Sequence, residues 1–348
     1  MRKKIVSIYS IIHFIVDLSC AILVTNLVTQ KLGEGVPLFL AIVLYNFFAF
    51  AMQFPIGVIA DKVNKNALCA ALGCTLVAIS FAFSNFGIVS CIIAGIGNAL
   101  FHIGGGIDVL NISDKKATLS GIFVSTGAMG IFLGSKSASV GFDKYYLVVA
   151  VLLVATITLS MLYKKISDKV INNKMKTIKL SREQVIAIIC IFITVTLRSY
   201  VGMILAFSWK SIFVYSLLFI IGVVLGKMLG GIIGDKIGYK KISISLIISA
   251  ICFIFAFENP FIGIIAILLF NMTMPITLIC LSNIFENNKG LAFGLLTLAL
   301  FVGAVPTFLG MNQLFTKIGL FTLTILSSIF LYISIRCTEK TNLTEKEN

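Results

Sequence analysis

Five polar side chains lie inside segments of the sequence that are otherwise apolar over membrane-spanning lengths. His13 and Asp17 are four residues apart, as are Asn98 and His102, so each pair lies on one face of a helix. Arg198 is the fifth. A charged side chain near the centre of a bilayer costs about 2.5–3.5 kcal/mol on insertion scales, and residues retained there usually face a cavity and carry function. The pattern therefore predicts proton transfer and anion binding within a membrane.

Asp17 is the expected proton carrier, because an acid in a poorly solvated cavity can take up and release a proton near neutral pH. His13 can share this proton, since imidazole titrates near physiological pH. Arg198 is the expected partner, which would pair with Asp17 before substrate binds and with an anionic substrate afterwards. The alternative is a static buried ion pair, with hydrogen-bonded histidines that only hold helices together.

The composition indicates that helices in lipid must position these residues, since 59% of the 348 residues are apolar and only 12% are charged. Twelve apolar segments approach the roughly 20 residues that a helix needs to cross the hydrocarbon. They are residues 5–28, 37–60, 67–84, 88–110, 118–134, 145–163, 184–206, 211–233, 242–257, 260–283, 290–311 and 318–335. No small-residue cleavage pattern follows any of them, so we interpret the first as a retained helix and not as a signal peptide. We predict an all-α integral membrane protein.

The basic residues are distributed unevenly between alternate loops of these twelve segments. If the N-terminus is cytoplasmic, the inner loops and termini hold 21 of the 28 lysines and arginines, whereas the outer loops hold five. This asymmetry follows the positive-inside rule and predicts that both termini are cytoplasmic. The net charge of +14 does not indicate nucleic-acid binding, because the one sizeable basic run, residues 163–183, is a short linker.

A short charged turn occurs twice, at residues 57–66 and 231–240. Its aspartates, Asp61 and Asp235, are 174 residues apart, which is half the length of the chain. Each copy follows the second apolar segment of its half, so the two halves have the same orientation. We therefore predict an N-terminal six-helix bundle (1–163), a basic cytoplasmic linker (164–183), a C-terminal six-helix bundle (184–336) and a disordered cytoplasmic tail (337–348).

The two six-helix halves, the basic central loop and the repeated Gly-x-x-x-Asp-Lys turn together resemble the major facilitator superfamily over essentially the whole chain. The second copy matches the family motif almost fully, whereas the first has Asn64 and Asn66 where glycine and a basic residue are usual. The resemblance implies a cytoplasmic gate in which the aspartates hold the inner side closed. The residues assigned to this gate are Gly57, Asp61, Lys62, Gly231, Asp235, Lys236, Gly238 and Lys240, with Asp108 added for its place near an inner helix end. Alternatively, the lysines only fix topology and the glycines only permit close helix packing.

Four further places resemble the fosmidomycin-resistance branch of this superfamily. They are the segments 13–17, 95–102, 127–134 and 198–200, and the chain departs from the branch at 104–106 and 135–136. In the superfamily the first, fourth, seventh and tenth helices line the central cavity, and here these helices hold most of the deep polar groups. The resemblance therefore implies that the substrate cavity is lined by Asn98, His102, Arg198, Asn271 and Thr273.

Together these features predict a secondary active transporter that exports a small anionic or amphiphilic compound, coupled to protons, by alternating access. The alternatives are uptake of a metabolite or nutrient, and a receptor or scaffold that keeps the fold without transport. We expect no enzymatic activity, no cofactor and no resident metal, although the two histidines with Asp17 could in principle hold a divalent ion. We expect a monomer in a bacterial inner membrane, with a small-molecule substrate, protons and the lipid bilayer as its partners.

Overall fold

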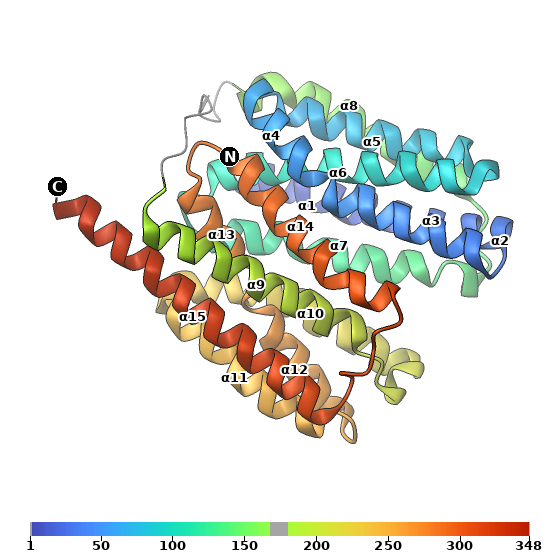
Figure 1. Ribbon diagram of the computed structural model, residues 1–348. Coiled ribbons are helices and arrows are strands. Elements are labelled where there is room, and N and C mark those ends of the chain that lie inside the picture. The colour runs from blue at the N-terminus through green and yellow to red at the C-terminus, as the bar shows by residue number, and fades with distance from the viewer. Residues whose placement is uncertain (1, 168–179, 348) are drawn as a thin grey trace. The chain divides into compact units, whose positions relative to one another are not determined.

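The computed structural model describes residues 2–167 and 180–347, and all the regular structure within them is helical (Figure 1). The α-helices are α1 (Arg2–Ile22), α2 (Thr29–Leu32), α3 (Val36–Asn46), α4 (Gln53–Val63), α5 (Asn66–Ala82), α6 (Gly87–Ile112), α7 (Ala117–Ser135), α8 (Tyr145–Ser167), α9 (Arg182–Ile204), α10 (Phe213–Ile237), α11 (Tyr239–Phe255), α12 (Pro260–Asn271), α13 (Met274–Ile284), α14 (Lys289–Phe308) and α15 (Lys317–Glu347). Shorter pieces are the π-helical turns η1 (Leu23–Val28) and η2 (Phe47–Ala51) and the 3₁₀ turns η3 (Ser84–Phe86), η4 (Ala138–Val140) and η5 (Ser208–Ser211).

Ten helical stretches within the described ranges are long and apolar enough to cross a membrane. They are Arg2–Leu32, Val36–Val63, Ser84–Ile112, Ala117–Ser135, Tyr145–Tyr163, Arg182–Ile204, Phe213–Ile237, Pro260–Ile284, Lys289–Phe308 and Lys317–Lys340. The remaining two predicted segments form α5 and α11, each of 17 residues. At about 1.5 Å per residue these cover roughly 26 Å, the lower end of the range that spans hydrocarbon. The prediction of an all-α protein with twelve membrane helices is confirmed.

Two places differ in detail from the sequence-based expectation. The tenth predicted segment is divided between α12 and α13, with Pro275 near the start of α13, where its missing N–H breaks no helical hydrogen bond. The prediction of a disordered tail after residue 337 is wrong for the described part, since α15 continues to Glu347. Residues 338–347 contain no glycine or proline and are rich in glutamate and lysine, so nothing in them stops a helix.

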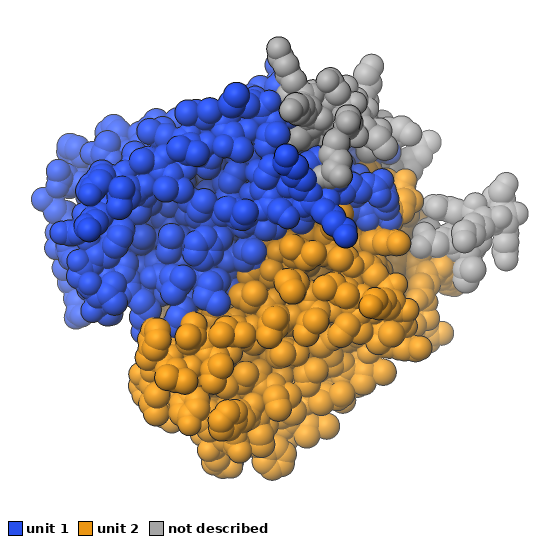
Figure 2. All heavy atoms as spheres, turned by 180° about the vertical axis from the view of Figure 1, so that it is seen from behind, with its two compact units in different colours: residues 1–114, 126–175, 287–298 blue, residues 115–125, 176–286, 299–348 orange. Residues whose placement is uncertain are grey.

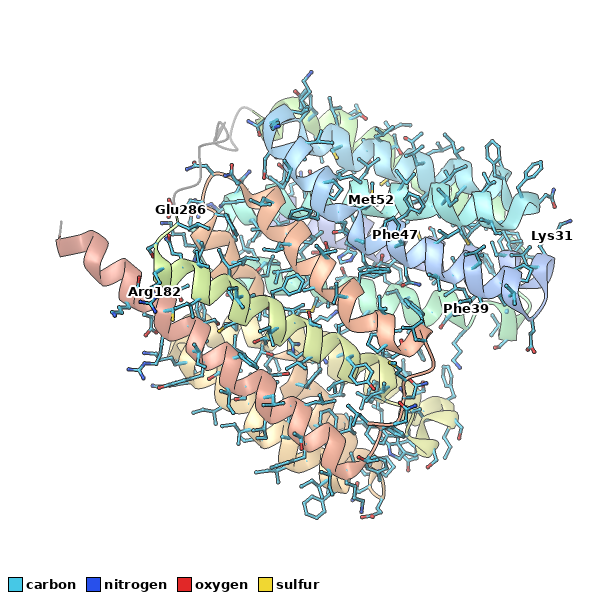
Figure 3. All side chains as sticks on the ribbon, in the orientation of Figure 1. Lys31, Phe39, Phe47, Met52, Arg182 and Glu286 are labelled. Carbon is cyan, nitrogen blue, oxygen red and sulfur yellow. The ribbon has the colours of Figure 1, made fainter. Side chains whose placement is uncertain are left out.

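Large apolar side chains are exposed along the helices, while several exposed charged ones lie at helix ends. Phe39 and Phe47 are 49% and 38% exposed, whereas Lys31, Arg182 and Glu286 lie at or next to helix termini (Figure 3). In water, so much exposed apolar surface would cause association, but in lipid it is the expected outer surface. The chain is therefore a multi-pass membrane protein.

The chain divides into two compact units (Figure 2). Unit 1 contains residues 1–114, 126–175 and 287–298, and unit 2 contains residues 115–125, 176–286 and 299–348. The first turns of α7 thus belong to unit 2, and those of α14 to unit 1. The bundles at 1–163 and 184–336 stay a prediction, and most of the linker at 164–183 lies outside the described residues.

Candidate functional site

In unit 1, the four polar residues singled out on the first and fourth predicted segments form one buried cluster. Asp17 of α1 accepts a hydrogen bond from Asn98 Nδ2 of α6, with 3.0 Å between Nδ2 and Oδ1. His13 Nε2 lies 3.2 Å from Asp17 Oδ2, and His102 Nε2 lies 3.7 Å from Asp17 Oδ1. The two histidine Nε2 atoms are 2.8 Å apart. The four-residue spacings therefore place both pairs on helix faces that meet.

The hydrogen bond of His102 to its own helix fixes its tautomer. His102 Nδ1 lies 2.9 Å from the backbone oxygen of Asn98. A carbonyl oxygen only accepts, so Nδ1 must carry a proton, and in the neutral ring Nε2 then presents a lone pair. In that form the lone pair faces His13 Nε2 at 2.8 Å. The cluster therefore holds a carboxylate and two imidazoles whose protonation states depend on one another.

Glycines of α7 allow this helix to approach α1 at the cluster. A Cβ atom at Gly127 would collide with Asp17 Oδ2 and His13 Nε2. One helical turn further on, a Cβ at Gly130 would meet the backbone of Phe14. Because α1 and α7 approach this closely, the wall of the cluster on the α7 side is backbone and not side chain.

In unit 2, Arg198 of α9 is buried, with 7% of its surface exposed. Its Nη2 donates to the backbone oxygen of Phe270 at 3.1 Å, and its guanidinium lies over the Phe270 ring, 5.0 Å from the centroid. Its Nε has no hydrogen-bond partner among the described residues, and no described carboxylate of unit 2 forms an ion pair with the guanidinium. A buried cation with so few compensating contacts is costly, which is typical of a site that receives an anion.

The two cavity residues predicted on the tenth segment lie beside the break between α12 and α13. Thr273 Oγ1 donates to the same Phe270 oxygen as Arg198, at 3.1 Å. Asn271 Nδ2 donates to the backbone oxygen of Ile267 at 2.9 Å. Arg198 and Thr273 therefore meet at one carbonyl group, while the Asn271 amide bonds within its own helix. The pairing of Arg198 with Asp17 stays a prediction.

The first of the two aspartates predicted for the gate caps a helix. Asp61, at the end of α4, accepts hydrogen bonds from the backbone N–H groups of Gly290 and Leu291 at the start of α14, both at 2.8 Å. These N–H groups have no partner within their helix, and the positive end of the helix dipole favours a carboxylate there. A Cβ at Gly57 would collide with the Gly290 backbone, so the glycine of the motif permits this approach.

The second aspartate predicted for the gate caps a different helix in the same way. Asp235 of α10 accepts from the N–H groups of Ala117 and Thr118 at the start of α7, both at 2.8 Å. It also accepts from the Thr118 hydroxyl at 2.5 Å and from the Tyr239 hydroxyl at 2.9 Å. A Cβ at Gly231 would meet the Ala117 backbone. In both copies of the turn, the aspartate therefore contacts a helix N-terminus.

The departure of the first copy from the motif has a backbone explanation. Asn64 has φ +52° and Gly238 has φ +94°, and each is the residue that ends its helix. Asparagine tolerates a left-handed conformation better than most residues, so it can stand where glycine is usual. Among the lysines, Lys240 forms an ion pair with Glu339, while Lys62 and Lys236 form no ion pair with any described residue.

Asp108 of α6 belongs to a second buried network in unit 1. It accepts from the hydroxyl of Tyr9 at 2.6 Å and from Nδ2 of Asn66 at 2.9 Å. Tyr9 lies one turn before His13 on α1, so that positions 9, 13 and 17 share a face. This spacing was the signal that could have identified Tyr9, which the sequence analysis missed. The gate role of Asp108 stays a prediction.

No protein-family model matches the chain, and no curated protein matches it in sequence. Solved structures do match its fold. The human organic anion transporter MFSD10 (TETRAN) matches with a TM-score of 0.68 and 12% identity over 96% of this chain and 99% of that chain. A bacterial homologue of the iron transporter ferroportin in its outward-facing state matches with a TM-score of 0.65, 12% identity and coverage of 97% and 98%. The Escherichia coli fucose:proton symporter FucP matches with a TM-score of 0.60, 11% identity and coverage of 96% and 97%. The chain therefore has the fold of the major facilitator transporters.

Proposed function

We propose that this protein is a proton-coupled secondary transporter that exports a small anionic or amphiphilic compound by alternating access. The observation that carries the proposal is the buried guanidinium of Arg198, for which no described carboxylate of unit 2 provides a counter-charge. The matched solved structures are an organic anion transporter, a fucose:proton symporter and a bacterial homologue of the iron transporter ferroportin. They support transport as the general activity. The support for an anionic substrate, for proton coupling and for a gate comes from the residues.

The chemistry of Arg198 supports an anionic substrate. A guanidinium presents donors in a planar fork that matches carboxylate, phosphate or phosphonate oxygens, and hydrogen bonds between two charged groups are about twice as strong as neutral ones. One Nη donor is occupied by the Phe270 carbonyl, and Nε has no hydrogen-bond partner among the described residues. The Phe270 ring beside it offers an apolar surface, which suits an amphiphilic anion.

The cluster around Asp17 supports proton coupling. Asp17, His13 and His102 lie within 2.8–3.7 Å of one another through their oxygen and nitrogen atoms. Titratable groups this close bind protons as a set, so that loading one proton changes the charge of the whole cluster. A change of charge in a poorly solvated site shifts the balance between conformations, which is the requirement for coupling.

The capping contacts of Asp61 and Asp235 support a gate that breaks and reforms. Each aspartate is held by two backbone N–H groups of a helix start, and such hydrogen bonds can exchange for water when the helix moves away. We place these residues on the cytoplasmic side of a bacterial inner membrane, with both termini cytoplasmic, because the basic residues concentrate in the corresponding loops. We propose a monomer as the working unit.

The test is proton flux in reconstituted vesicles under an imposed pH gradient, with a panel of phosphonates, organic anions and cationic drugs. We expect at least one anion to drive proton movement in the wild type, Arg198→Ala to abolish the response, and Asp17→Asn to uncouple it. Lys210→Ala is the matched control for Arg198, because Lys210 also lies over a phenylalanine ring, 4.4 Å from the Phe219 centroid. It lies in the η5 turn and is expected to keep wild-type flux.

Two results would overturn the proposal. If Arg198→Ala transports anions as well as the wild type, Arg198 does not bind the substrate. If Asp17→Asn retains anion-driven proton flux, the coupling proton binds elsewhere or another ion drives transport.

A further inference from the structure

We propose that His13, Asp17 and His102 form a binding site for a divalent transition-metal ion. One ligand atom from each residue can be chosen so that all three lie within 4.8 Å of one another. This inference rests on the geometry of unit 1 alone, and it holds whether or not the protein couples transport to protons. The ion competes with protons for the same three side chains.

The nitrogen and oxygen atoms of the three residues lie close to the spacing that a common centre requires. Zinc bound tetrahedrally at about 2.0–2.1 Å places its ligand atoms about 3.4 Å from one another. The separations here are 2.8 Å between the two Nε2 atoms, 3.2 Å from His13 Nε2 to Asp17 Oδ2, and 3.7 Å from His102 Nε2 to the other carboxylate oxygen, Oδ1. The site therefore opens when the two imidazoles move apart by about half an ångström and one carboxylate oxygen turns to face both of them.

The ligand types select the metal. Two neutral imidazoles and one carboxylate suit Zn²⁺, Co²⁺, Ni²⁺ or Fe²⁺, whereas Mg²⁺ and Ca²⁺ prefer sites made of oxygen atoms. Three protein ligands also leave coordination positions open, as in sites where the ion exchanges or reacts. The inferred ion is therefore an exchangeable first-row transition metal and not a structural one.

Hydrogen bonds from neighbouring groups already orient two of the three ligands, as is usual for metal ligands. A histidine that binds metal through one nitrogen usually donates its other N–H to a carbonyl or carboxylate, and His102 donates Nδ1–H to the Asn98 oxygen at 2.9 Å. The Asn98 side chain also fixes Asp17 through the 3.0 Å hydrogen bond from Nδ2. Asn98 therefore orients two of the three ligands from one position on α6.

The direct test is a Co²⁺ titration of the purified full-length protein, which must carry an affinity tag without histidine. We expect one Co²⁺ per chain with the visible absorption of a four- or five-coordinate nitrogen and oxygen site, an affinity that falls as pH is lowered, and no displacement by excess Mg²⁺. His13 and His102 are the only two histidines in the sequence, so a histidine-ligated spectrum can arise nowhere else in the chain. Absence of binding, or displacement by Mg²⁺, would overturn the inference.

Variants then locate the ion. His102→Gln should weaken Co²⁺ binding by about 100-fold or more, since loss of even an outer partner costs about 10–100-fold. Gly127→Ala keeps all three ligand residues but adds a Cβ that collides with Asp17 Oδ2 and His13 Nε2. It should therefore also weaken Co²⁺ binding. Cys91→Ser, a buried thiol outside the cluster, is the matched control and should bind as the wild type does. Binding that survives replacement of both histidines would place the metal elsewhere and overturn the inference.

The outcome is separable from that of the proposed function. Co²⁺ binding with no anion-driven proton flux would support this site and contradict proton-coupled export. Intact anion-driven proton flux without Co²⁺ binding would do the reverse. Should a variant fail to fold, the stoichiometry, pH dependence and Mg²⁺ resistance of the wild type still decide the question.

Discussion

In the two copies of the charged turn, an aspartate caps a helix N-terminus with different numbers of hydrogen bonds. Asp61 and Asp235 each accept two consecutive backbone N–H groups at a helix start, at 2.8 Å in all four cases. Asp235 also accepts the hydroxyls of Thr118 and Tyr239. The shared part is the contact between a carboxylate and a helix N-terminus, and the side-chain donors are an addition of the second copy.

This difference indicates that the two caps are not equally strong. A hydrogen bond to a charged group contributes about 1.5–3 kcal/mol, so two further donors should make the Asp235 cap the more stable one. If both caps must break when a gate opens, the Asp61 side should open first. The following predictions test this inequality, beginning with the largest effect.

Removal of the carboxylates should have unequal consequences. Asp61→Ala leaves two N–H groups unsatisfied and should lower the free energy of unfolding by about 2 kcal/mol. Asp235→Ala also removes the acceptor of the Thr118 hydroxyl and the nearer of the two acceptors of the Tyr239 hydroxyl, and should cost about 1 kcal/mol or more beyond that. Denaturant unfolding in detergent micelles measures both values. Equal losses would show that the side-chain donors add nothing.

Removal of the two hydroxyls should make the second cap resemble the first. Thr118→Val together with Tyr239→Phe keeps the backbone N–H groups and the ring, and should cost about 1 kcal/mol for each hydroxyl. In that background, Asp235→Ala should cost no more than Asp61→Ala does in the wild type. Tyr200→Phe is the control, because its hydroxyl also donates, but to the backbone oxygen of Met311 and not to a carboxylate. A double variant as stable as the wild type would contradict the prediction.

The helix ends after the two aspartates should respond differently to substitution. Gly238→Ala should destabilise the protein by about 1 kcal/mol or more, because φ is +94° there. No heavy atom lies within 4 Å of where the new Cβ would be, so that cost is conformational and not steric. Asn64→Gly should change stability by only a few tenths of a kcal/mol, since both residues adopt φ +52°. Thermal unfolding of the two variants side by side tests this contrast. A Gly238→Ala variant as stable as the wild type would contradict the prediction.

The smallest effect belongs to the ion pair of Lys240 with Glu339, which is present only beside the second copy. The two side chains are 41% and 49% exposed, so the pair is screened by solvent. Lys240→Ala should change the free energy of unfolding by at most about 0.5 kcal/mol, and less at high salt. A loss near that of Asp61→Ala would mean that Lys240 has a structural role that its exposure does not indicate.

The elements and the same-face pairs could be predicted from sequence because both depend on local spacing. Apolar runs located all twelve membrane helices, and the four-residue separations brought His13 to Asp17 and Asn98 to His102. The capping partners could not be identified, because Gly290 and Ala117 contribute only backbone N–H groups, and every residue except proline has one. The Phe270 oxygen that accepts from Arg198 escaped prediction for the same reason.

The buried guanidinium of Arg198 also offers a practical test of the anionic cargo that we propose. An anion that binds the folded protein and not the unfolded chain raises the free energy of unfolding, by about 2.7 kcal/mol when its concentration is 100 times its dissociation constant. A buffer screen by thermal shift, comparing wild type with Arg198→Ala, would therefore rank candidate compounds by the melting temperature they add. The same ranking would name the anion to include during purification, when a membrane protein is most prone to denature.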